Sequence, residues 1–361
     1  MAGAYSPVQV LELPDKHVYV LFASLTHQQL RINKAIKENT LYKLFEASPS
    51  NGDAGASLDA RGETMVNTNA QQSSLSNLMI QARKNCNHPF LFQAPMDSDG
   101  HWVLDERLVD QSGKMQLLDR MLKVLRPKGH KVLVFFQMTR MMDIVEDYLE
   151  ELRGWRCCRI DGGVPMAQRQ EQMQLFESDP DIFVFLLSTR SGGQGISLPA
   201  ADTVIIYDSD FNPQQDLQAM DRCHRIGQTK PVHVLRLATA HSVEGKMLRS
   251  ANSKLALEKL VITKGNFRQE IGKEAEAASK KNKASGGGVS TDELIALLRG
   301  DVEDGEGSLA QSTDISDENL EMIMNRDDLI GKAPPNPPTG PGWEEVEDRS
   351  GMSILGNVNK E

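Results

Sequence analysis

Short apolar runs alternate with amphipathic segments between residues 113 and 237. The continuous apolar run at 131–136 is typical of a strand buried on both faces. The predicted strands are residues 131–136, 156–160, 183–187, 203–207 and 232–237. Between them, apolar residues recur at helical spacing, as at Met142, Val145, Leu149 and Leu152. Strands that alternate with helices predict an α/β fold, with a parallel sheet covered by helices on both faces.

The segments outside this region have a different composition. Residues 46–74 contain few large apolar side chains and many Ser, Asn and Gly, so we expect a flexible, disordered insertion there. The prolines of residues 333–342 exclude a helix and a central strand, because proline lacks the backbone N–H. Two acidic, apolar-striped segments begin with a cap-like Thr or Ser, and they predict short helices at 291–299 and 316–329.

The charge is unevenly distributed along the chain. The formal net charge is -10, but residues 270–361 hold 20 Asp and Glu against 9 Lys and Arg. The rest of the chain is therefore nearly neutral, and a nucleic-acid partner stays possible because the local field of a cleft controls binding. The acidic segment is predicted to be a solvated, largely flexible tail. A contact with basic histone tails, or autoinhibition of a DNA cleft, is the alternative.

The cysteines and the hydropathy pattern restrict the class of protein. The four cysteines form no C-x-x-C pair, and Cys86 with His88 has no second half of a zinc site. We therefore expect reduced thiols and no metal centre. No apolar stretch is long enough to span a bilayer, and no signal-peptide pattern is present, so the sequence predicts a soluble intracellular protein without a membrane partner.

A glycine-rich loop follows the predicted strand 183–187. It begins with Ser188 and Thr189 and contains Gly192, Gly193 and Gly195. Glycines let backbone N–H groups approach an anion, and the hydroxyls add donors, so this composition is typical of a phosphate cradle. A plain glycine-rich turn explains the pattern equally well.

A second loop leads into a helix with two arginines near its end. Gln218, Arg222 and Arg225 are spaced to share one face. The arginine fork matches phosphate oxygens and stays charged at every physiological pH, which favours a role as arginine fingers on a transferring phosphoryl group. The alternative is a surface helix whose arginines pair with Asp216 and Asp221.

A third turn, Asp161-Gly162-Gly163, precedes a helix that carries Arg169. Taken alone it is an ordinary strand-to-helix turn. Ligands of parallel sheets collect at the carboxyl ends of the strands, so we expect all three loops to lie along that edge.

Together these loops resemble the successive motifs of one known family. The segments KVLVFFQMTRMMDIVEDYL, RIDGGVPMAQRQEQMQLF, LLSTRSGGQGISLPAADTVIIYDSDFNP and DLQAMDRCHRIGQTKPVHVLRL are similar, in order and spacing, to those of the second RecA-like lobe of SNF2-family chromatin-remodelling ATPases. The run HRIGQ with the preceding DR is close to diagnostic of that family. The C-terminal segments TDISDENLEMIMNRDDL and GPGWEEV resemble the lymphoid-specific-helicase type, above all its plant "decrease in DNA methylation" members.

The resemblance implies a division of the chain. It places the end of a first lobe at 1–45, an inter-lobe connector at 75–112, the RecA-like C-terminal helicase lobe at 113–240 and a brace helix at 241–267. The insertion at 46–74 and the acidic tail at 268–361 complete the predicted organisation.

The resemblance also implies roles for individual residues. Arg222 and Arg225 match arginine fingers that reach ATP, and Gln218 matches a position that couples nucleotide to DNA. The family's DNA-backbone loop corresponds to Ser188, Thr189, Gly192, Gly193 and Gly195. The implied cofactor is ATP with Mg²⁺, the implied partners are double-stranded DNA, nucleosomes with their histones and a first RecA-like lobe, and the implied location is the nucleus.

One set of residues is missing from the sequence. No GxxxxGK[ST] run and no DEGH- or DEAH-type acidic pair occurs in the 361 residues. Because these groups hold MgATP, we expect the chain to be half of a motor, a hydrolase only when a first lobe completes it. The alternatives are a non-enzymatic DNA- or nucleosome-binding module and a remodeler of the imitation-switch type. The latter carries a SANT-like helical module where this chain has its acidic tail.

Overall fold

The computed structural model describes the central region and two pieces of the C-terminal region. The described residues are 14, 16–38, 68–99, 102–189, 196–223, 228–248, 314–326, 336–337 and 339–346. The greater part of the predicted insertion, the helix predicted at 291–299 and most of the predicted brace helix lie outside these residues.

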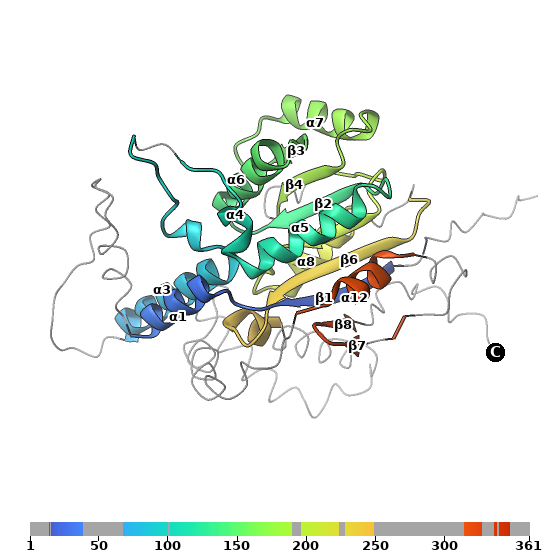
Figure 1. Ribbon diagram of the computed structural model, residues 1–361. Helices are drawn as coiled ribbons and strands as arrows, with labels where there is room; N and C mark the ends of the chain where they lie inside the picture. Colours follow the sequence, from blue (N-terminus) through green and yellow to red (C-terminus); the bar gives the residue numbers. More distant parts are fainter. Residues whose placement is uncertain are drawn as a thin grey trace, which may run out of the picture.

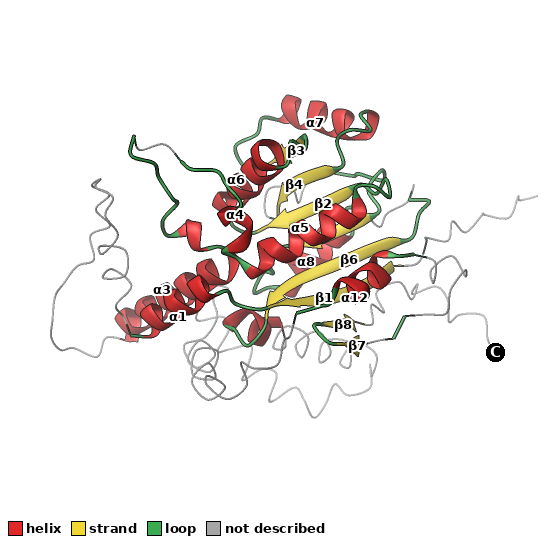
Figure 2. Cartoon of the chain, viewed as in Figure 1, coloured by secondary structure: helices red, strands yellow, loops and turns green. Residues whose placement is uncertain are grey.

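An eight-stranded sheet forms the centre of the protein (Figures 1 and 2). In spatial order its strands are β3 (Cys157–Ile160), β4 (Val184–Ser188), β2 (Val132–Phe136), β5 (Thr203–Ile206), β6 (Val232–Thr239), β1 (Lys16–Ala23), β8 (Trp343–Val346) and β7 (Thr339–Gly340). The six strands from β3 to β1 pair in parallel, whereas β8 pairs with β1 and β7 with β8 in antiparallel fashion. The predicted parallel sheet is confirmed, and it carries an antiparallel edge that the pattern did not predict.

The apolar runs form strands because each side chain finds a packed layer on its own face. Along β2, Val132 and Val134 belong to the core on one face, and Leu133 and Phe135 belong to the core on the other. All five residues of β2 and of β4 are buried. Since successive strand residues point to opposite faces, burial of every residue requires a layer of helices on both sides of the sheet.

Helices supply these two layers. They include α1 (His27–Lys37), α3 (Thr68–Asn87), α4 (Arg107–Asp110), α5 (Gly113–Leu125), α6 (Thr139–Asp147), α7 (Met166–Ser178), α8 (Pro213–Met220) and α12 (Asp317–Met324). Short segments at Pro89–Leu91 and Tyr148–Leu152 form a 3-10 and a π-helical turn. α5, α6 and α12 contribute to one core and α7 and α8 to the other, and α5 and α8 lie on opposite faces in Figure 1. α1 and α3 lie side by side and project beyond the sheet.

The regions outside the predicted lobe contribute to the same fold. β1, which the resemblance places at the end of a first lobe, is a full strand of this sheet and pairs with β6 over eight positions. Residues 68–74, predicted as part of the insertion, belong to α3. Residues 243–248, at the start of the predicted brace helix, are helical.

Two pieces of the predicted acidic tail are packed on the protein. α12 lies against α5, and β8 forms antiparallel pairs with β1. Trp343 of β8 is 2% exposed and its ring lies 5.8 Å from that of Tyr19. Burial of a large apolar side chain such as that of Trp343 is favourable, so these pieces of the tail are part of the folded core rather than a solvated chain.

Candidate nucleotide and DNA site

The glycine-rich loop leaves the carboxyl end of β4 through two buried hydroxyl residues. Ser188 and Thr189 are each 6% exposed. The backbone N–H and the Oγ1 hydroxyl of Thr189 both donate hydrogen bonds to the carbonyl oxygen of Phe136, at 2.9 and 3.1 Å. The Thr189 hydroxyl is therefore engaged within the protein in this conformation. Gly192, Gly193 and Gly195 lie outside the described residues.

α8 starts just after β5, where Asn212 caps its first turn by accepting a hydrogen bond from the N–H of Gln214. Asp216 of this helix is buried and pairs with Arg236 of β6 at 2.6 Å. Burial raises the pKa of the Asp216 carboxyl, although the Arg236 charge opposes the shift. Asp216 is thus engaged by the sheet, which weakens the alternative that it serves as a partner for the arginines of the helix end.

The end of α8 meets the segment that follows the glycine-rich loop. Arg222 is half-buried, and its carbonyl oxygen accepts a hydrogen bond of 3.4 Å from the N–H of Leu198. The Sγ of Cys223 donates to the carbonyl oxygen of Ala201 at 2.8 Å. The end of α8 therefore contacts the segment that follows the glycine-rich loop, while Gln218 is exposed and Arg225 lies outside the described residues.

The position of this contact corrects one expectation. Ala201 precedes the first residue of β5, and Asp221 lies 4.0 Å from Lys16, the first residue of β1. The end of α8 is therefore near the amino-terminal ends of these strands. The expectation that all three loops lie along the carboxyl edge was wrong for the arginine turn, because α8 runs back along the face of the sheet from that edge.

The third loop is an ordinary turn with an ion-pair network around it. Arg159 contacts Asp143, Glu146 and Asp161 at 2.5 to 2.9 Å. Arg169 donates from its guanidinium to backbone carbonyls of the turn, including that of Asp161 at 3.1 Å. These contacts stabilise the turn, in agreement with its interpretation as an ordinary strand-to-helix turn.

A buried lysine at the carboxyl edge was missed by the sequence analysis. The Nζ of Lys114, at the start of α5, donates to Asn87 Oδ1 at 2.9 Å, to the Tyr207 carbonyl oxygen at 3.0 Å and to Glu244 Oε1 at 2.7 Å. Asn87 in turn contacts the buried carboxylate of Asp208, whose pKa is raised mainly by burial. The one local signal in the sequence is the Gly113-Lys114 pair at the start of a helix, which by itself predicts no buried network.

A second buried network lies at the opposite edge of the sheet. Asp202 is 1% exposed and accepts from His130 Nδ1 at 3.0 Å and from Arg326 at 3.2 Å. Burial would raise the pKa of Asp202, but the His130 hydrogen bond and the Arg326 charge outweigh it, so the pKa is lowered. Arg326 comes from the predicted tail, and it also donates to the Pro231 carbonyl oxygen and to Thr203. No local sequence signal links residues this far apart.

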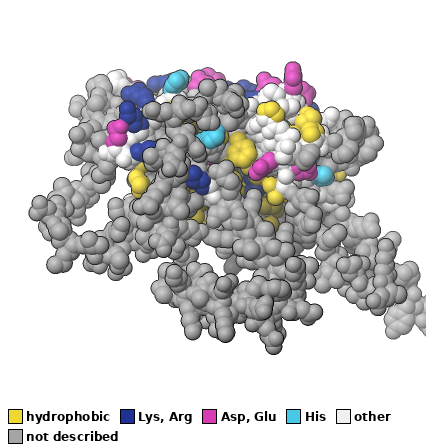
Figure 3. Space-filling view, turned by 90° about the horizontal axis from the view of Figure 1, so that it is seen from below, with side chains coloured by type: hydrophobic (Ala, Val, Ile, Leu, Met, Phe, Trp, Pro, Cys, Tyr) yellow, Lys and Arg dark blue, Asp and Glu magenta, His cyan; other side chains and the backbone are white. Residues whose placement is uncertain are grey.

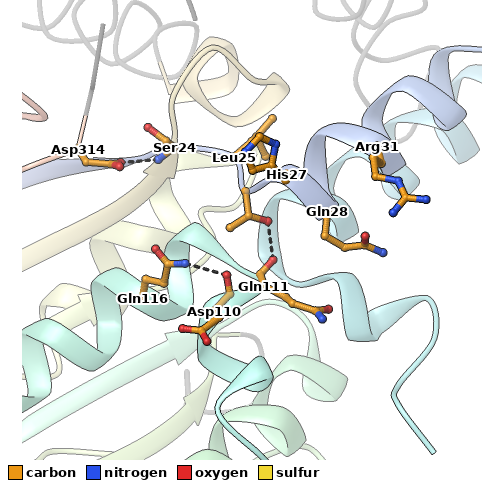
Figure 4. A pocket seen from close by; sticks show the side chains of 10 residues that line it. Ser24, Leu25, His27, Gln28, Arg31, Asp110, Gln111, Gln116 and Asp314 are labelled. Atoms are coloured by element: carbon orange, nitrogen blue, oxygen red, sulfur yellow. Dashed lines mark hydrogen bonds between the residues drawn. The ribbon is translucent and has the colours of Figure 1, made fainter. Parts of the chain in front are cut away.

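A hollow of about 520 Å³ lies at the carboxyl end of β1, away from the arginine turn (Figure 4). Its walls are joined by hydrogen bonds from Thr26 Oγ1 to the Gln111 carbonyl oxygen, at 2.8 Å, and from Gln116 to the Asp110 carbonyl oxygen, at 2.7 Å. Neither Ser188 nor Arg222 lines it. We therefore do not place the nucleotide there.

Within the described ranges, no cluster of three His, Cys, Asp or Glu side chains could hold a metal ion. His88 is used internally: its Nδ1 accepts from the Phe90 N–H and its Nε2 lies 2.7 Å from the Leu108 carbonyl oxygen, while burial lowers its pKa to about 4. All four cysteines are unbridged.

On the face in Figure 3, basic and acidic side chains are interspersed over the described surface. None of the described helices has the length and hydropathy that a membrane span requires.

Comparisons with known proteins agree on one class. The profile of the helicase conserved C-terminal domain matches residues 113–227. The chain is 43% identical over 357 residues to the ATP-dependent DNA helicase DDM1 of Arabidopsis thaliana, which covers 97% of this chain and 43% of that protein. It is 48% identical over 257 residues to the lymphoid-specific helicase of Homo sapiens, with 71% of this chain and 30% of that protein covered. The crystal structure of the C-terminal part of the Fun30 ATPase domain superposes with a TM-score of 0.53 at 28% identity, covering 66% of this chain and 90% of that one.

The fold and the matched domain define a RecA-like C-terminal helicase lobe. The chain carries this lobe in the form found in the SNF2 family of chromatin-remodelling ATPases, and it is similar to DDM1 and to the lymphoid-specific helicase. It spans less than half the length of these two curated relatives.

Proposed function

We propose that the chain acts as the second motor lobe of an ATP-driven, DNA-translocating nucleosome remodeler of the nucleus. A first RecA-like lobe holds MgATP, and Arg222 and Arg225 extend toward its triphosphate. The loop from Ser188 through Gly192, Gly193 and Gly195 contacts the DNA backbone. Gln218, exposed on α8, couples the two events.

One observation carries this proposal. The end of α8 with Arg222 is hydrogen-bonded to the segment that leaves the glycine-rich loop, through Leu198 N–H and the Arg222 carbonyl oxygen. A motor needs such a contact, because a change at the phosphates must be transmitted to the DNA-binding loop. The half-buried position of Arg222 supports the finger role, since a guanidinium stabilises phosphoryl charge best where water is partly excluded.

No P-loop run occurs in the 361 residues, so we expect no ATP hydrolysis by this chain tested alone. The measurement is ATPase activity of the chain with and without duplex DNA. Turnover above background would contradict the assignment of nucleotide binding to a separate first lobe. DNA or nucleosome binding without turnover would be the behaviour of the non-enzymatic module, which is the second candidate for the isolated chain.

The finger assignment is tested in a two-lobe protein, in which this chain is joined to a first lobe. Arg225→Ala should reduce turnover by about 10³-fold and leave DNA affinity nearly unchanged, because a finger acts on the transition state. Arg107→Ala is the matched control, since Arg107 is an exposed arginine of the connector that pairs with Asp105. Normal turnover by the Arg225→Ala protein would refute the assignment.

Similarity in the tail favours the lymphoid-specific-helicase type over the imitation-switch type. The match to DDM1 covers 97% of the chain, so it extends into the acidic segment. Packing of α12 and β8 on the lobe also supports a tail that belongs to this domain rather than to a separate helical module.

A further inference from the structure

The carbonyl oxygen of Ala201 joins the segment that follows the glycine-rich loop to the region around the arginines. It accepts a hydrogen bond from Cys223 Sγ at 2.8 Å and another from Gln228 Nε2 at 2.7 Å. The same Nε2 lies 3.3 Å from the carbonyl oxygen of Cys223. Cys223 and Gln228 flank the stretch that contains Arg225, so the Gln228 side chain joins the two ends of that stretch to each other and to Ala201.

The other end of the same amide is also engaged. Gln228 Oε1 accepts from the N–H of Thr229 at 3.0 Å and from that of Lys230 at 2.9 Å. Gln228 is 6% exposed. Two N–H donors and one oxygen acceptor are required at this position, and among side chains of this length only glutamine offers both. The reverse orientation of the amide would place its oxygen against two carbonyl oxygens.

The backbone adds a third link. Leu198 N–H donates to the Arg222 carbonyl oxygen, and Leu198 and Ala201 are buried residues of the segment that follows the glycine-rich loop. We propose that Gln228 is a positioning residue that holds the arginine-bearing turn against the segment Ile196–Ala201, so that the two loops move as one unit. This inference rests on the function proposed above, and it adds the side chain that transmits motion between the nucleotide and the DNA.

The expected size of the effect follows from geometry. A displacement of about 1 Å in a catalytic group can reduce turnover by about 10²-fold. Loss of the Gln228 amide leaves two buried carbonyl oxygens with fewer donors, so the turn is expected to shift rather than to keep its place. ATP affinity should change little, because in the proposed motor the first lobe holds most of the nucleotide.

The physical link can be tested on this chain without any nucleotide. Burial raises the pKa of the Cys223 thiol to about 12, so the thiol should react slowly with an alkylating reagent. In Gln228→Met and Gln228→Glu, peptide mapping should show alkylation of Cys223 at least tenfold faster, while the buried Cys86 keeps its wild-type rate as the internal reference for global unfolding. Unchanged protection of Cys223 in both variants would overturn the proposal.

The positioning role is tested in the two-lobe protein by DNA-stimulated ATPase activity from pH 6 to pH 8.5. At pH 8, Gln228→Met and Gln228→Glu should lower kcat about 10²-fold with a nearly unchanged KM for ATP. Burial raises the pKa of a carboxyl, and a protonated Glu at this position can again donate to the Ala201 carbonyl oxygen. The Gln228→Glu protein should therefore recover at least tenfold relative to wild type as the pH falls to 6, and Gln228→Met should not.

The outcomes separate this inference from the proposed function. Wild-type kcat in both variants, or a Gln228→Glu profile parallel to that of Gln228→Met, overturns the positioning role. Suppose instead that Arg225→Ala has normal turnover and that Cys223 is selectively exposed in the Gln228 variants. That result would refute the finger assignment and leave the link between the turn and Ala201 in place.

Discussion

Replacing Lys114 with methionine tests whether the buried network at the carboxyl edge stabilises the lobe. The Lys114 side chain is 0% exposed and pairs with Glu244, which is 8% exposed, at 2.7 Å. The substitution keeps the length of the side chain and removes three hydrogen bonds, to Asn87, the Tyr207 carbonyl oxygen and Glu244. The α5 start, the connector, the end of β5 and the segment after β6 all meet at this ammonium group.

The magnitude follows from the burial of the pair. Removing one partner of a buried ion pair costs about 3–5 kcal/mol, because the other charge is left without compensation. Glu244 would keep two contacts, from the backbone N–H of Thr239 at 3.2 Å and from its hydroxyl at 3.1 Å. We therefore expect Lys114→Met to lower the free energy of unfolding by about 3 kcal/mol, the low end of that range.

Urea unfolding of this chain, followed by tryptophan fluorescence, measures the change. Lys34→Met is the matched control, because Lys34 and Glu38 form an exposed i,i+4 pair at 3.9 Å, a type worth about 0.3–0.5 kcal/mol. The double variant Lys114→Met/Glu244→Gln should show a coupling energy of about 1–3 kcal/mol. If Lys114→Met costs no more than Lys34→Met, or the cycle shows no coupling, the reasoning from burial is refuted.

Three further predictions concern the tail and the DNA. The folded pKa of Asp202 lies below its unfolded value of about 3.9, so its ion pair with Arg326 and its bond with His130 stabilise the protein above that pH and are lost as the pH falls through the folded pKa. Asp202→Asn should therefore flatten the loss of unfolding free energy in acid titrations, and an unchanged slope would contradict this. Trp343→Ala should cost about 3 kcal/mol and lower the melting temperature by about 6–12 °C, because the indole is buried against Tyr19; an unchanged melting curve would mean that the tail is detached in solution. Binding of duplex DNA should weaken steeply with salt, by about 10³-fold between 50 and 200 mM if six phosphates are contacted, and a flat salt profile would argue against the proposed backbone contact.

The core of the sheet was predictable from local pattern. Runs such as Val132–Phe136 and Val184–Leu187 are apolar at every position, and such a run has few stable placements other than a strand covered on both faces. The helices between them follow from the 3.6-residue period of their apolar stripes. Composition was less informative for the tail, because Trp343 and α12 lie in a strongly acidic region whose average hides short apolar segments.

The candidate site was predictable as a set of residue types but not as an arrangement. The arginines and the glycine-rich loop were recognised from their order and spacing. The contact of the end of α8 with Leu198 and Ala201, after the glycine-rich loop, depends on where α8 ends after crossing the sheet, and that position corrected the expected edge. In the sequence, Gln228 is only the last residue of the HRIGQ run. Its contacts with the carbonyl oxygens of Ala201 and Cys223 cannot be predicted, because these two residues come from separate segments.

Local chemistry along the chain thus dictated which segments become strands and helices, and which side chains are candidates for binding phosphate. Folding dictated which of them meet. Lys114 finds Glu244 across 130 residues, and Arg326 finds Asp202 across 124, in pairings that no local period encodes. The reason is physical: burying a charge is costly unless an opposite charge is already held in place, and packing of the whole sheet supplies that placement.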